Sequence, residues 1–480
     1  MAYNGTLQNS NITAGYMDLA TAWKLEGEYL YGLTPISKEF GNPCAKTYFI
    51  KVHKRSTWFT QIPVLCRVSN APAEFGRDFS VTVNRLGEYL LNTWLKVTLP
   101  EVKILPTNQF GVDGRIRWCR KFMHNLIEDC TITFNEQQVS RLDNHILDFM
   151  TAFCIGSDKK FNYDRMIGDI DQLVGSHGPT TPLGATLPET TLNLPLPFFF
   201  TRETGLALPT AALLFNEIKI NFKFRNWNEL LILDNTGAGG SGTVARAVPI
   251  VGTDIAIAPA LKNVNVWGTY ALVNEHERKI MAELKRDMII EQYQTASKMP
   301  FNPILQPNPI YEPKFTMAVK ALYFAARNTT FENERSIYST ASPYNDGNIV
   351  NFAPSGAAPV VKDLTLNYES TTRLSAMTWD YFSQIVPYYC ALTTPMELGY
   401  GLYSYALHLE DTDASGSTNF GKIGNVQVSP TPSSAALVAA NGSGPAGSGA
   451  DYPQTFTWHM IARSYTVIRV SEGQITFPYI

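Results

Sequence analysis

The sequence predicts an all-β protein with two halves, each the size of a β-sandwich such as a jelly roll, with a few short helices and long loops. Two observations predict this fold class. The 480 residues include 29 prolines, 33 glycines and 12% aromatic residues, a mixture that disfavours long helices and suits short strands joined by turns. Apolar and polar residues also alternate in short segments of both halves, as they do in half-buried strands. Many strands with long proline-rich loops are typical of jelly rolls and related sandwiches.

The clearest predicted strand is EIKINFKFR at residues 217–225. Ile218, Ile220, Phe222 and Phe224 alternate with polar residues, so one face of the strand is apolar and the other is polar. We expect an antiparallel strand that buries one face. The same alternation predicts further strands at residues 79–83, 131–134, 263–273 and 364–368.

Helical patterns are sparse. The segments at residues 142–153 and 275–288 each predict a short helix, because their apolar residues recur at helical spacing. The apolar side of the second helix is expected to consist of Ile280, Met281, Leu284 and Met288. Gly-rich and Ser-rich composition predicts long loops near 234–262 and 429–452. The changeover between the two sandwiches is expected around residues 226–262.

The composition points to a surface that is largely covered by protein. Charged residues make up 17% of the chain, against roughly 25% in average soluble proteins. We therefore expect contacts with other chains, including copies of the same chain. The net charge of -3 gives no electrostatic reason to expect nucleic acid as a partner.

The chain shows no sign of a targeting segment. The first fifteen residues lack the basic start and apolar core of a secretory signal, and no apolar run reaches the ~18 residues that a membrane helix needs. The six cysteines are scattered without a CxxC pair. They are expected to be reduced thiols in a cytosolic setting.

One glycine-rich segment, GAGGSG at residues 237–242, matches the GxGxxG pattern of dinucleotide-binding loops. Such a site needs a helix directly after the loop, so that its first amides can hold the pyrophosphate. Here β-branched residues and Pro249 follow. A flexible loop is therefore expected rather than a nucleotide site.

The acidic segment DTDASGS at residues 411–417 resembles the start of a calcium-binding loop. The twelfth position of such a loop carries a glutamate that binds the ion, but here it is Lys422. An acidic turn between strands is expected, and a weak ion site stays open.

The segment RIRWCRKFMHN at residues 115–125 gathers three arginines and a lysine around a tryptophan. Basic residues beside aromatic ones can bind nucleic acid by charge neutralisation and stacking. However, Arg115 and Arg117 alternate with Ile116 and Trp118, as they would if the arginines lay on the solvent-facing side of a strand. Direct nucleic-acid binding is therefore not expected.

No catalytic pattern stands out in the sequence. It contains no HExxH, GxSxG or Walker A motif, and its seven histidines show no metal spacing, so we expect neither enzymatic activity nor a cofactor. Glycosylation motifs occur at Asn4, Asn11, Asn328 and Asn441. Asn441 lies in a low-complexity segment and is the candidate expected to be exposed.

Five segments carry a family resemblance. They are NITAGYMDLAT from Asn11, TYFIKVHKRSTWFTQIP from Thr47, GRIRWCRKFMHNLIE from Gly114, LPLPFFFTRETGLALPTAALLFNEIKI from Leu194 and GLYSYALHLEDTDASGSTNFGKI from Gly401. In this order they resemble the major capsid proteins of large icosahedral nucleocytoplasmic DNA viruses, most closely those of the iridovirus and marseillevirus kind. Ordered matches over most of a chain are hard to produce by chance.

The resemblance implies an N-terminal arm at residues 1–25, a first jelly roll at 26–230 and a second at 231–480. It also implies homotrimers with a pseudo-hexagonal outline, which tile an icosahedral shell over an inner viral membrane. Neighbouring trimers, minor capsid proteins and penton proteins are the implied partners. The protein is expected in the virion capsid and, during assembly, in the host cytoplasm.

The segment PLPFFF at residues 195–200 shows no alternation. This predicts a strand whose two faces both meet protein. Phe198, Phe199 and Phe200 are expected in the core of the first sandwich or at its junction with the second, where they are candidates for a part in assembly. A plain core strand is the alternative.

A binding function of another class also stays open. A lectin-like β-sandwich would recognise glycans through exposed aromatic rings and loop carboxylates. Its candidate residues are Tyr400, Tyr403, Asp411 and Asp413. A stable trimer that binds no sugar would count against this alternative.

Overall fold

The computed structural model describes residues 56–68, 73–175, 186–235, 246–330, 332–340, 358–369, 371–442 and 453–478. By its internal contacts the chain divides into a unit of residues Met1–Trp58 and a unit of residues Phe59–Ile480, and the second unit holds the features below. The predicted arm at 1–25 and the GAGGSG segment at 237–242 lie outside the described residues.

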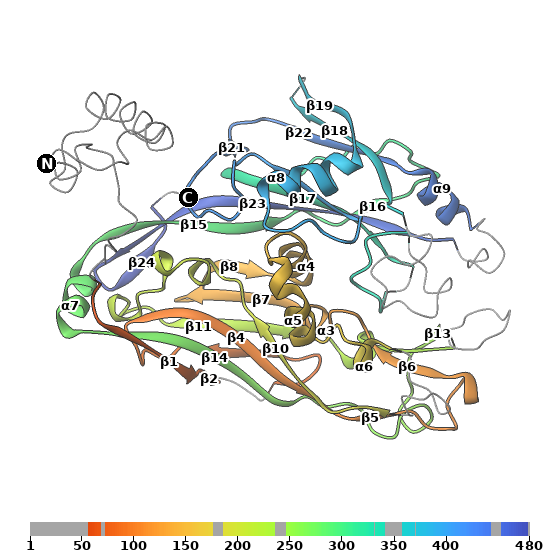
Figure 1. Ribbon diagram of the computed structural model, residues 1–480, viewed down its shortest axis with the longest axis horizontal. Helices are drawn as coiled ribbons and strands as arrows, with labels where there is room; N and C mark the ends of the chain where they lie inside the picture. The colour runs from red at the N-terminus through yellow and green to blue at the C-terminus, as the bar shows by residue number, and fades with distance from the viewer. Residues whose placement is uncertain are drawn as a thin grey trace, which may run out of the picture. The chain divides into compact units, whose positions relative to one another are not determined.

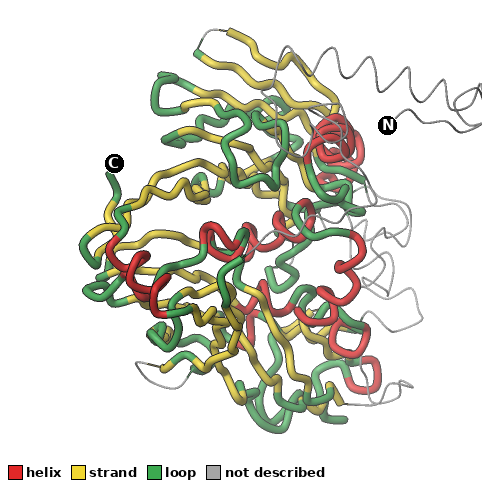
Figure 2. The backbone as a smooth tube through the Cα atoms, turned by 60° about the vertical axis from the view of Figure 1, so that its left-hand side comes forward, coloured by secondary structure: helices red, strands yellow, loops and turns green. Residues whose placement is uncertain are grey.

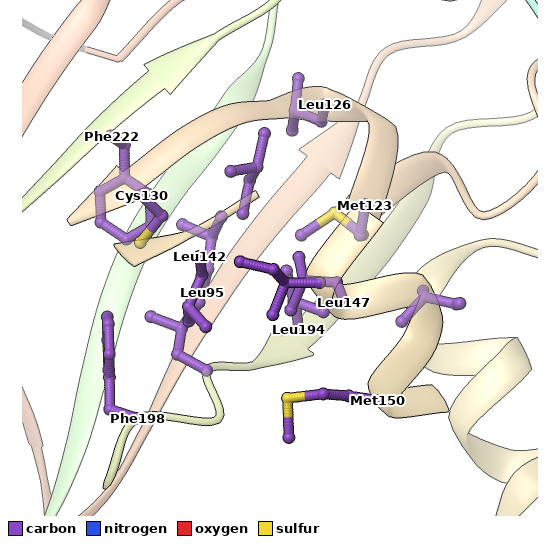
Figure 3. Close-up of a cluster of buried hydrophobic side chains, with 14 of the residues drawn as sticks. Leu95, Met123, Leu126, Cys130, Leu142, Leu147, Met150, Leu194, Phe198 and Phe222 are labelled. Atoms are coloured by element: carbon purple, nitrogen blue, oxygen red, sulfur yellow. The ribbon is translucent and has the colours of Figure 1, made fainter. Parts of the chain in front are cut away.

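Two antiparallel sheets, built mainly from the first half of the chain, share one hydrophobic core (Figure 1). The first has the order β1 (Phe59–Leu65), β14 (Lys262–Val273), β4 (Tyr89–Leu99), β10 (Thr190–Pro195). The second has the order β2 (Arg67–Val68), β3 (Asp78–Thr82), β11 (Ile218–Phe224), β7 (Ile127–Phe134), β8 (Gln137–Leu142). Leu95 and Leu194 of the first sheet meet Cys130, Leu142 and Phe222 of the second in this core (Figure 3).

A second pair of sheets encloses a second core. The larger sheet has the order β15 (Arg286–Thr295), β23 (Phe456–Ser471), β17 (Ala318–Asn328), β20 (Tyr400–Ser404), and β16 (Met299–Phe301), β21 (Thr418–Asn419) and β24 (Gln474–Thr476) pair with its members. The smaller has the order β19 (Thr371–Thr378), β18 (Val361–Tyr368), β22 (Val426–Pro432). Two small sheets complete the strands: β13 (Arg246–Ala247), β12 (Leu231–Asp234), β6 (Arg115–Trp118), and β5 (Val102–Lys103), β9 (Thr186–Leu187).

The predicted alternation is confirmed in β11. Its apolar residues Ile218, Ile220, Phe222 and Phe224 are all buried, whereas the polar residues between them are partly or fully exposed. Phe222 stacks on Phe79 of β3 with ring centroids 4.8 Å apart. The predicted strands at 79–83, 131–134, 263–273 and 364–368 are also present, as β3, β7, β14 and β18.

The central strands β17 and β23 behave differently, because both of their faces are buried. Phe324, Trp458 and Met460 belong to the second core, whereas Tyr323 and Ile461, one residue along, belong to the first. The sheet that these strands form therefore separates the two cores and serves both. Buried on two sides, such strands lose the alternation that marks a half-buried strand.

Both predicted helices are confirmed, one of them shorter than expected. Helix α4 (Asn144–Phe153) begins at Asp143, whose side chain accepts a hydrogen bond from the Ile146 amide at 2.8 Å. Helix α7 (Glu275–Glu283) ends at Glu283, and Leu284 is its C-cap. Met288 therefore lies in strand β15 and not on the helix, because the chain turns into the sheet from Arg286.

Two predictions about irregular segments were wrong. Strand β10 ends at Pro195, and Phe199–Thr201 forms the 3₁₀ helix η3, so the expected strand through the three phenylalanines does not form. Prolines without amide donors end the ladder here. The expected loop at 429–452 contains the end of β22 and helix α9 (Ser434–Asn441), which begins where Ser433 accepts a hydrogen bond from the Ala436 amide.

The remaining helices are short, and strands account for more of the described residues than helices do (Figure 2). They are α3 (Phe122–Leu126), α5 (Ser157–Ile167), α6 (Asp171–Val174), α8 (Val386–Cys390), the π-helix η7 (Tyr381–Ile385) and the 3₁₀ turns η2 (Gly111–Asp113), η4 (Thr204–Leu206), η5 (Thr210–Ala212) and η6 (Trp227–Glu229). Within the residues that the structure describes, none of the helices has the length and apolar character of a membrane span.

Candidate functional site

A layer of buried and partly buried ionisable side chains lies where the two cores meet. We call it the polar layer. Its members are Arg117, Arg120, Lys121, His124, His145, Asp148, Arg202, Glu291, Lys320, Arg327, Glu334, Glu397, Glu410, His459 and Arg463. They come from both halves of the chain, so their contacts join the two halves to each other.

Glu291 on β15 is the centre of one network in this layer. It accepts hydrogen bonds from Lys320 Nζ at 2.7 Å and Arg463 Nε at 2.9 Å, on β17 and β23 of the same sheet. Arg202, just after η3, approaches the same carboxylate at 3.6 Å and also pairs with Glu410. Burial opposes the charge of Glu291, but Arg463, Arg202 and Lys320 together hold the pKa of its carboxyl below the usual value.

Asp148 on α4 is the centre of a second network. It accepts hydrogen bonds from His124 Nδ1 at 2.8 Å, Ser336 Oγ at 2.7 Å and the Tyr338 hydroxyl at 3.0 Å. Burial disfavours its charge, but Lys121 and His124 outweigh this effect and lower the pKa of Asp148 to about 2. Burial in turn lowers the pKa of His124, so the imidazole is neutral and donates from Nδ1.

The basic segment at residues 115–125 belongs to this layer. Strand β6 is buried along its whole length, so the expectation that Arg115 and Arg117 face solvent was wrong. Arg117 pairs with Glu334 and lies 3.5 Å from Asp234, whereas Arg120 donates to Glu397 at 3.1 Å. Because acidic side chains of the same chain already neutralise these arginines, they are not available to the phosphates of a nucleic acid.

The three phenylalanines of the PLPFFF segment lie in the first core. Phe198, Phe199 and Phe200 are each at most 2% exposed. The ring of Phe200 stacks on Phe198 at 5.8 Å and meets Phe199 edge-on at 5.4 Å. Figure 3 shows Phe198 in the same cluster of buried side chains as Leu95 and Leu142. The part that these residues play in assembly stays a prediction.

The residues of the glycan-binding alternative do not form an open site. Tyr400 and Tyr403 are only 2% and 8% exposed, so neither ring can stack on a sugar. The segment 411–417 is a turn between β20 and β21, and its backbone carbonyls at Asp411 and Asp413 accept hydrogen bonds from Lys320 and Tyr465. Across the described ranges, no three His, Cys, Asp or Glu side chains converge as a metal site would require.

Asn441 is the last residue of α9 and is exposed, whereas Asn328 is buried in β17. Glycosylation at Asn441 stays a prediction. Asn4 and Asn11 lie outside the described residues.

An apolar hollow of about 580 Å³ lies on the surface beside η7 and α8. Its lining consists of Gln384, Ile385, Tyr388, Tyr389, Thr394, Pro395 and Leu398, none of which is charged. Tyr388 and Tyr389 are each 75% exposed and pack edge-on with ring centroids 5.2 Å apart. Exposed aromatic rings without charged neighbours are typical of the centre of a protein interface.

Comparison with known families identifies the chain. Residues 47–274 match the family described as "Major capsid protein N-terminus", and residues 277–476 match "Large eukaryotic DNA virus major capsid protein". The chain belongs to this capsid protein family. The resemblance inferred from the sequence is thereby confirmed.

Relatives and solved structures agree with this assignment. The chain is 47% identical to the major capsid protein of Invertebrate iridescent virus 6 over 98% of this chain and 99% of that protein. It is 36% identical to that of Lymphocystis disease virus 1 over 98% of this chain and 99% of that protein. Its fold resembles PBCV-1 VP54, with a TM-score of 0.71 at 22% identity over 90% of this chain and all of that one.

The Faustovirus major capsid protein has a similar fold, with a TM-score of 0.68 at 11% identity over 96% of this chain and 98% of that one. At such identities the likeness concerns the fold alone. It confirms the predicted double jelly roll.

Proposed function

We propose that this capsid protein is the structural subunit of an icosahedral virion shell and assembles as pseudo-hexagonal homotrimers. The observation that carries the proposal is the presence of two jelly rolls in one chain, joined through the shared sheet of β17 and β23. Three copies around a threefold axis present six similar lobes, which gives a nearly hexagonal outline suited to tiling flat faces.

The apolar hollow supports this proposal as a candidate contact between subunits. A heterologous contact around a threefold axis needs two different complementary patches on each chain. The hollow supplies one apolar patch, and exposed residues such as Ile257 and Leu305 supply apolar projections elsewhere on the surface. Interfaces between permanent partners bury on the order of 2,000 Å² or more, so this hollow would be only one part of the contact.

Further partners and boundaries belong to the same proposal. We propose neighbouring trimers, minor capsid proteins and penton proteins as partners in the virion, with the inner membrane nearby and assembly in the host cytoplasm. The work of the chain is association rather than catalysis.

Strands β12 and β14 pair with strands that precede residue 230, so we place the boundary between the jelly rolls near Asn274 instead of at 230/231.

The proposal is tested by the mass of the purified protein in solution. Light scattering should give a species near three times the 53.4 kDa chain mass, and negative-stain images should show a hexagonal outline. A monomer at every protein concentration would contradict the proposal if it persisted after refolding and after coexpression with a viral chaperone.

A further inference from the structure

Two buried histidines face each other across the junction of the jelly rolls. His145 on α4 and His459 on β23 have ring centroids 4.1 Å apart, and they are 3% and 1% exposed. His145 Nδ1 lies 2.9 Å from the Tyr338 hydroxyl. Within the described residues, neither ring nitrogen of His459 has a hydrogen-bond partner. A neutral ring tolerates such a site, whereas a protonated ring would leave an unsolvated charge.

Cationic side chains flank the pair from the neighbouring strands. Ala325 lies opposite His459 in the β17–β23 ladder, so Arg327, two residues further on, projects from the same face of the sheet. On the other side of β23, Met299 lies opposite Trp458, which places Lys298 level with His459. The side chains beside His459 are therefore basic on both flanks.

Other charged and polar groups lie around the pair on the neighbouring elements. From the end of β11, Arg225 donates to Asn144 at the start of α4, 3.1 Å away. From the segment before β18, Arg335 pairs with Glu229, and Tyr338 bonds to Asp148. Asp143, at the N-terminus of α4, is the nearby carboxyl group that opposes the cations.

These surroundings disfavour a charge on either imidazole. Burial, then His459, Arg327, Lys298 and Arg225 hold the pKa of His145 well below its usual value. Burial, with Arg327 and Lys298, lowers the pKa of His459 to about 3. The carboxylates at the centres of the neighbouring networks have lowered pKa values and stay ionised in mild acid. The two histidines are thus groups whose protonation the folded chain opposes as the pH falls.

We propose that the His145–His459 pair is an acid-sensitive joint: below about pH 6, proton uptake by these two residues separates α4 from β23 and loosens the first jelly roll from the second. The joint is a property of the folded chain and does not require assembly. Its consequence for a virion, the release of the shell in an acidic compartment, rests on the proposed function.

The sign of the effect follows from linkage. An unfolded histidine has a pKa of about 6.5. As the pH falls below this value, the unfolded chain therefore binds more protons at these two positions than the folded chain does. The stability contribution is complete above pH 6.5 and is lost progressively toward the folded pKa. Each such proton raises the unfolding equilibrium constant about tenfold per pH unit. Burial raises the pKa values of Asp143 and Asp164, which acts in the opposite direction, so variants are needed to isolate the pair.

The test is urea unfolding of the full-length protein between pH 7.5 and 5.0, at one protein concentration, for the wild type and His459→Phe. Phenylalanine keeps the ring and forfeits no hydrogen bond seen here, so the variant should match the wild type at pH 7.5. Between pH 6 and 5, its unfolding constant should rise about tenfold less than that of the wild type. Equal pH slopes would overturn the proposal.

His408→Phe is the matched control, because His408 is exposed on the same half of the chain. Its pH slope should equal that of the wild type, and a loss as large as that in His459→Phe would contradict a role specific to the pair. His145→Phe replaces the partner ring and serves if His459→Phe does not fold. Hydrogen exchange, corrected for intrinsic rates, should show α4 and β23 losing protection at pH 5.5 before β18 does; the reverse order would also overturn the joint.

Discussion

The two faces of the β17–β23 sheet differ in chemistry although they belong to the same strands. One face carries Phe324, Trp458 and Met460 and packs into the second core, where the rings of Phe324 and Trp458 stack at 6.2 Å. The other face carries Arg463, which pairs with Glu291 of the same sheet, and Arg202 from the first half of the chain approaches that carboxylate at 3.6 Å. It also carries His459, whose ring faces that of His145. Both faces are buried, but the first packs through apolar side chains, whereas the second adds directional contacts to the apolar packing of Tyr323 and Ile461.

This difference suggests that the two faces have different structural roles. Apolar packing stabilises without fixing one orientation, because it is roughly proportional to buried area. Ion pairs with defined geometry discriminate between relative positions, although their net contribution to stability is often small. We infer that the apolar face supplies stability to the second jelly roll, and that the polar layer fixes how the first jelly roll sits on it.

The largest effect on stability should come from a charge placed in the first core, at a residue that precedes Arg202 of the polar layer in the sequence. Phe199→Asp buries a carboxylate without a partner, which costs several kcal/mol. We expect no soluble folded protein, as judged by yield and circular dichroism. Phe215→Asp is the control, because Phe215 is 68% exposed and should tolerate the change. A soluble, normally melting Phe199→Asp protein would show that the segment does not lie in the core.

The next effect tests the polar face. Arg463→Met removes one partner of the buried Glu291 network and should destabilise by about 3–5 kcal/mol in urea unfolding at pH 7.5. Arg469→Met, on the same strand, removes a partly exposed pair with Asp287 and should cost less than about 1 kcal/mol. Similar losses in the two variants would erase the distinction between buried and exposed pairs.

The stability lost in Arg463→Met should also depend on pH. Arg463 is one of the cations that hold the pKa of Glu291 below its usual value, a contribution that is present above the unfolded pKa and lost as the pH falls. Without Arg463, the pKa of Glu291 should rise, and protonation should then relieve the unpaired charge. The destabilisation of Arg463→Met should therefore be smaller at pH 5 than at pH 7.5. A constant difference across this range would place the loss in packing rather than in charge.

The apolar face gives the contrasting case. Met460→Ala should destabilise by about 2–5 kcal/mol through lost burial and the resulting cavity. Since no titratable group is removed, this loss should be the same at pH 7.5 and pH 5. A clear pH dependence for Met460→Ala would mean that the two faces are coupled more tightly than their separate contacts indicate.

The smallest effect on stability should come from the exposed hollow. Tyr389→Ser should change the unfolding free energy of the isolated chain by no more than about 0.5 kcal/mol, because the residue is 75% exposed. If the hollow is a subunit contact, the variant should shift light-scattering mass toward the monomer. Tyr311→Ser, at a buried tyrosine, should instead lower stability. An unchanged trimer in Tyr389→Ser would remove the hollow from the interface.

The sequence correctly predicted the elements whose position depends on a local pattern of apolar and polar residues. Strand β11 and helices α4 and α7 were found because one face of each differs from the other in polarity. The central strands β17 and β23 lack such a signal, since both faces are buried. The PLPFFF segment was misjudged for the related reason that an apolar run does not reveal its backbone conformation, and here Pro197 precedes a 3₁₀ turn.

The polar layer could not be predicted because its partners lie far apart along the chain. Arg117 and Glu334 are separated by 217 residues, and nothing near either one points to the other. Lone charged residues inside otherwise apolar strands, such as Lys320 and Arg463, were the available signal. They mark positions that need a partner, without saying which.

The central claim is that the shared sheet makes the two jelly rolls one cooperative unit, and hydrogen exchange of the full-length protein in increasing urea tests it most directly. At pH 7.5, where the histidine pair is neutral, peptides from β11 in the first jelly roll, β18 in the second and β23 between them should lose protection together, in one opening reaction. If β18 opened at clearly lower urea while β11 and β23 stayed protected, the jelly rolls would be independent units and the account would be contradicted.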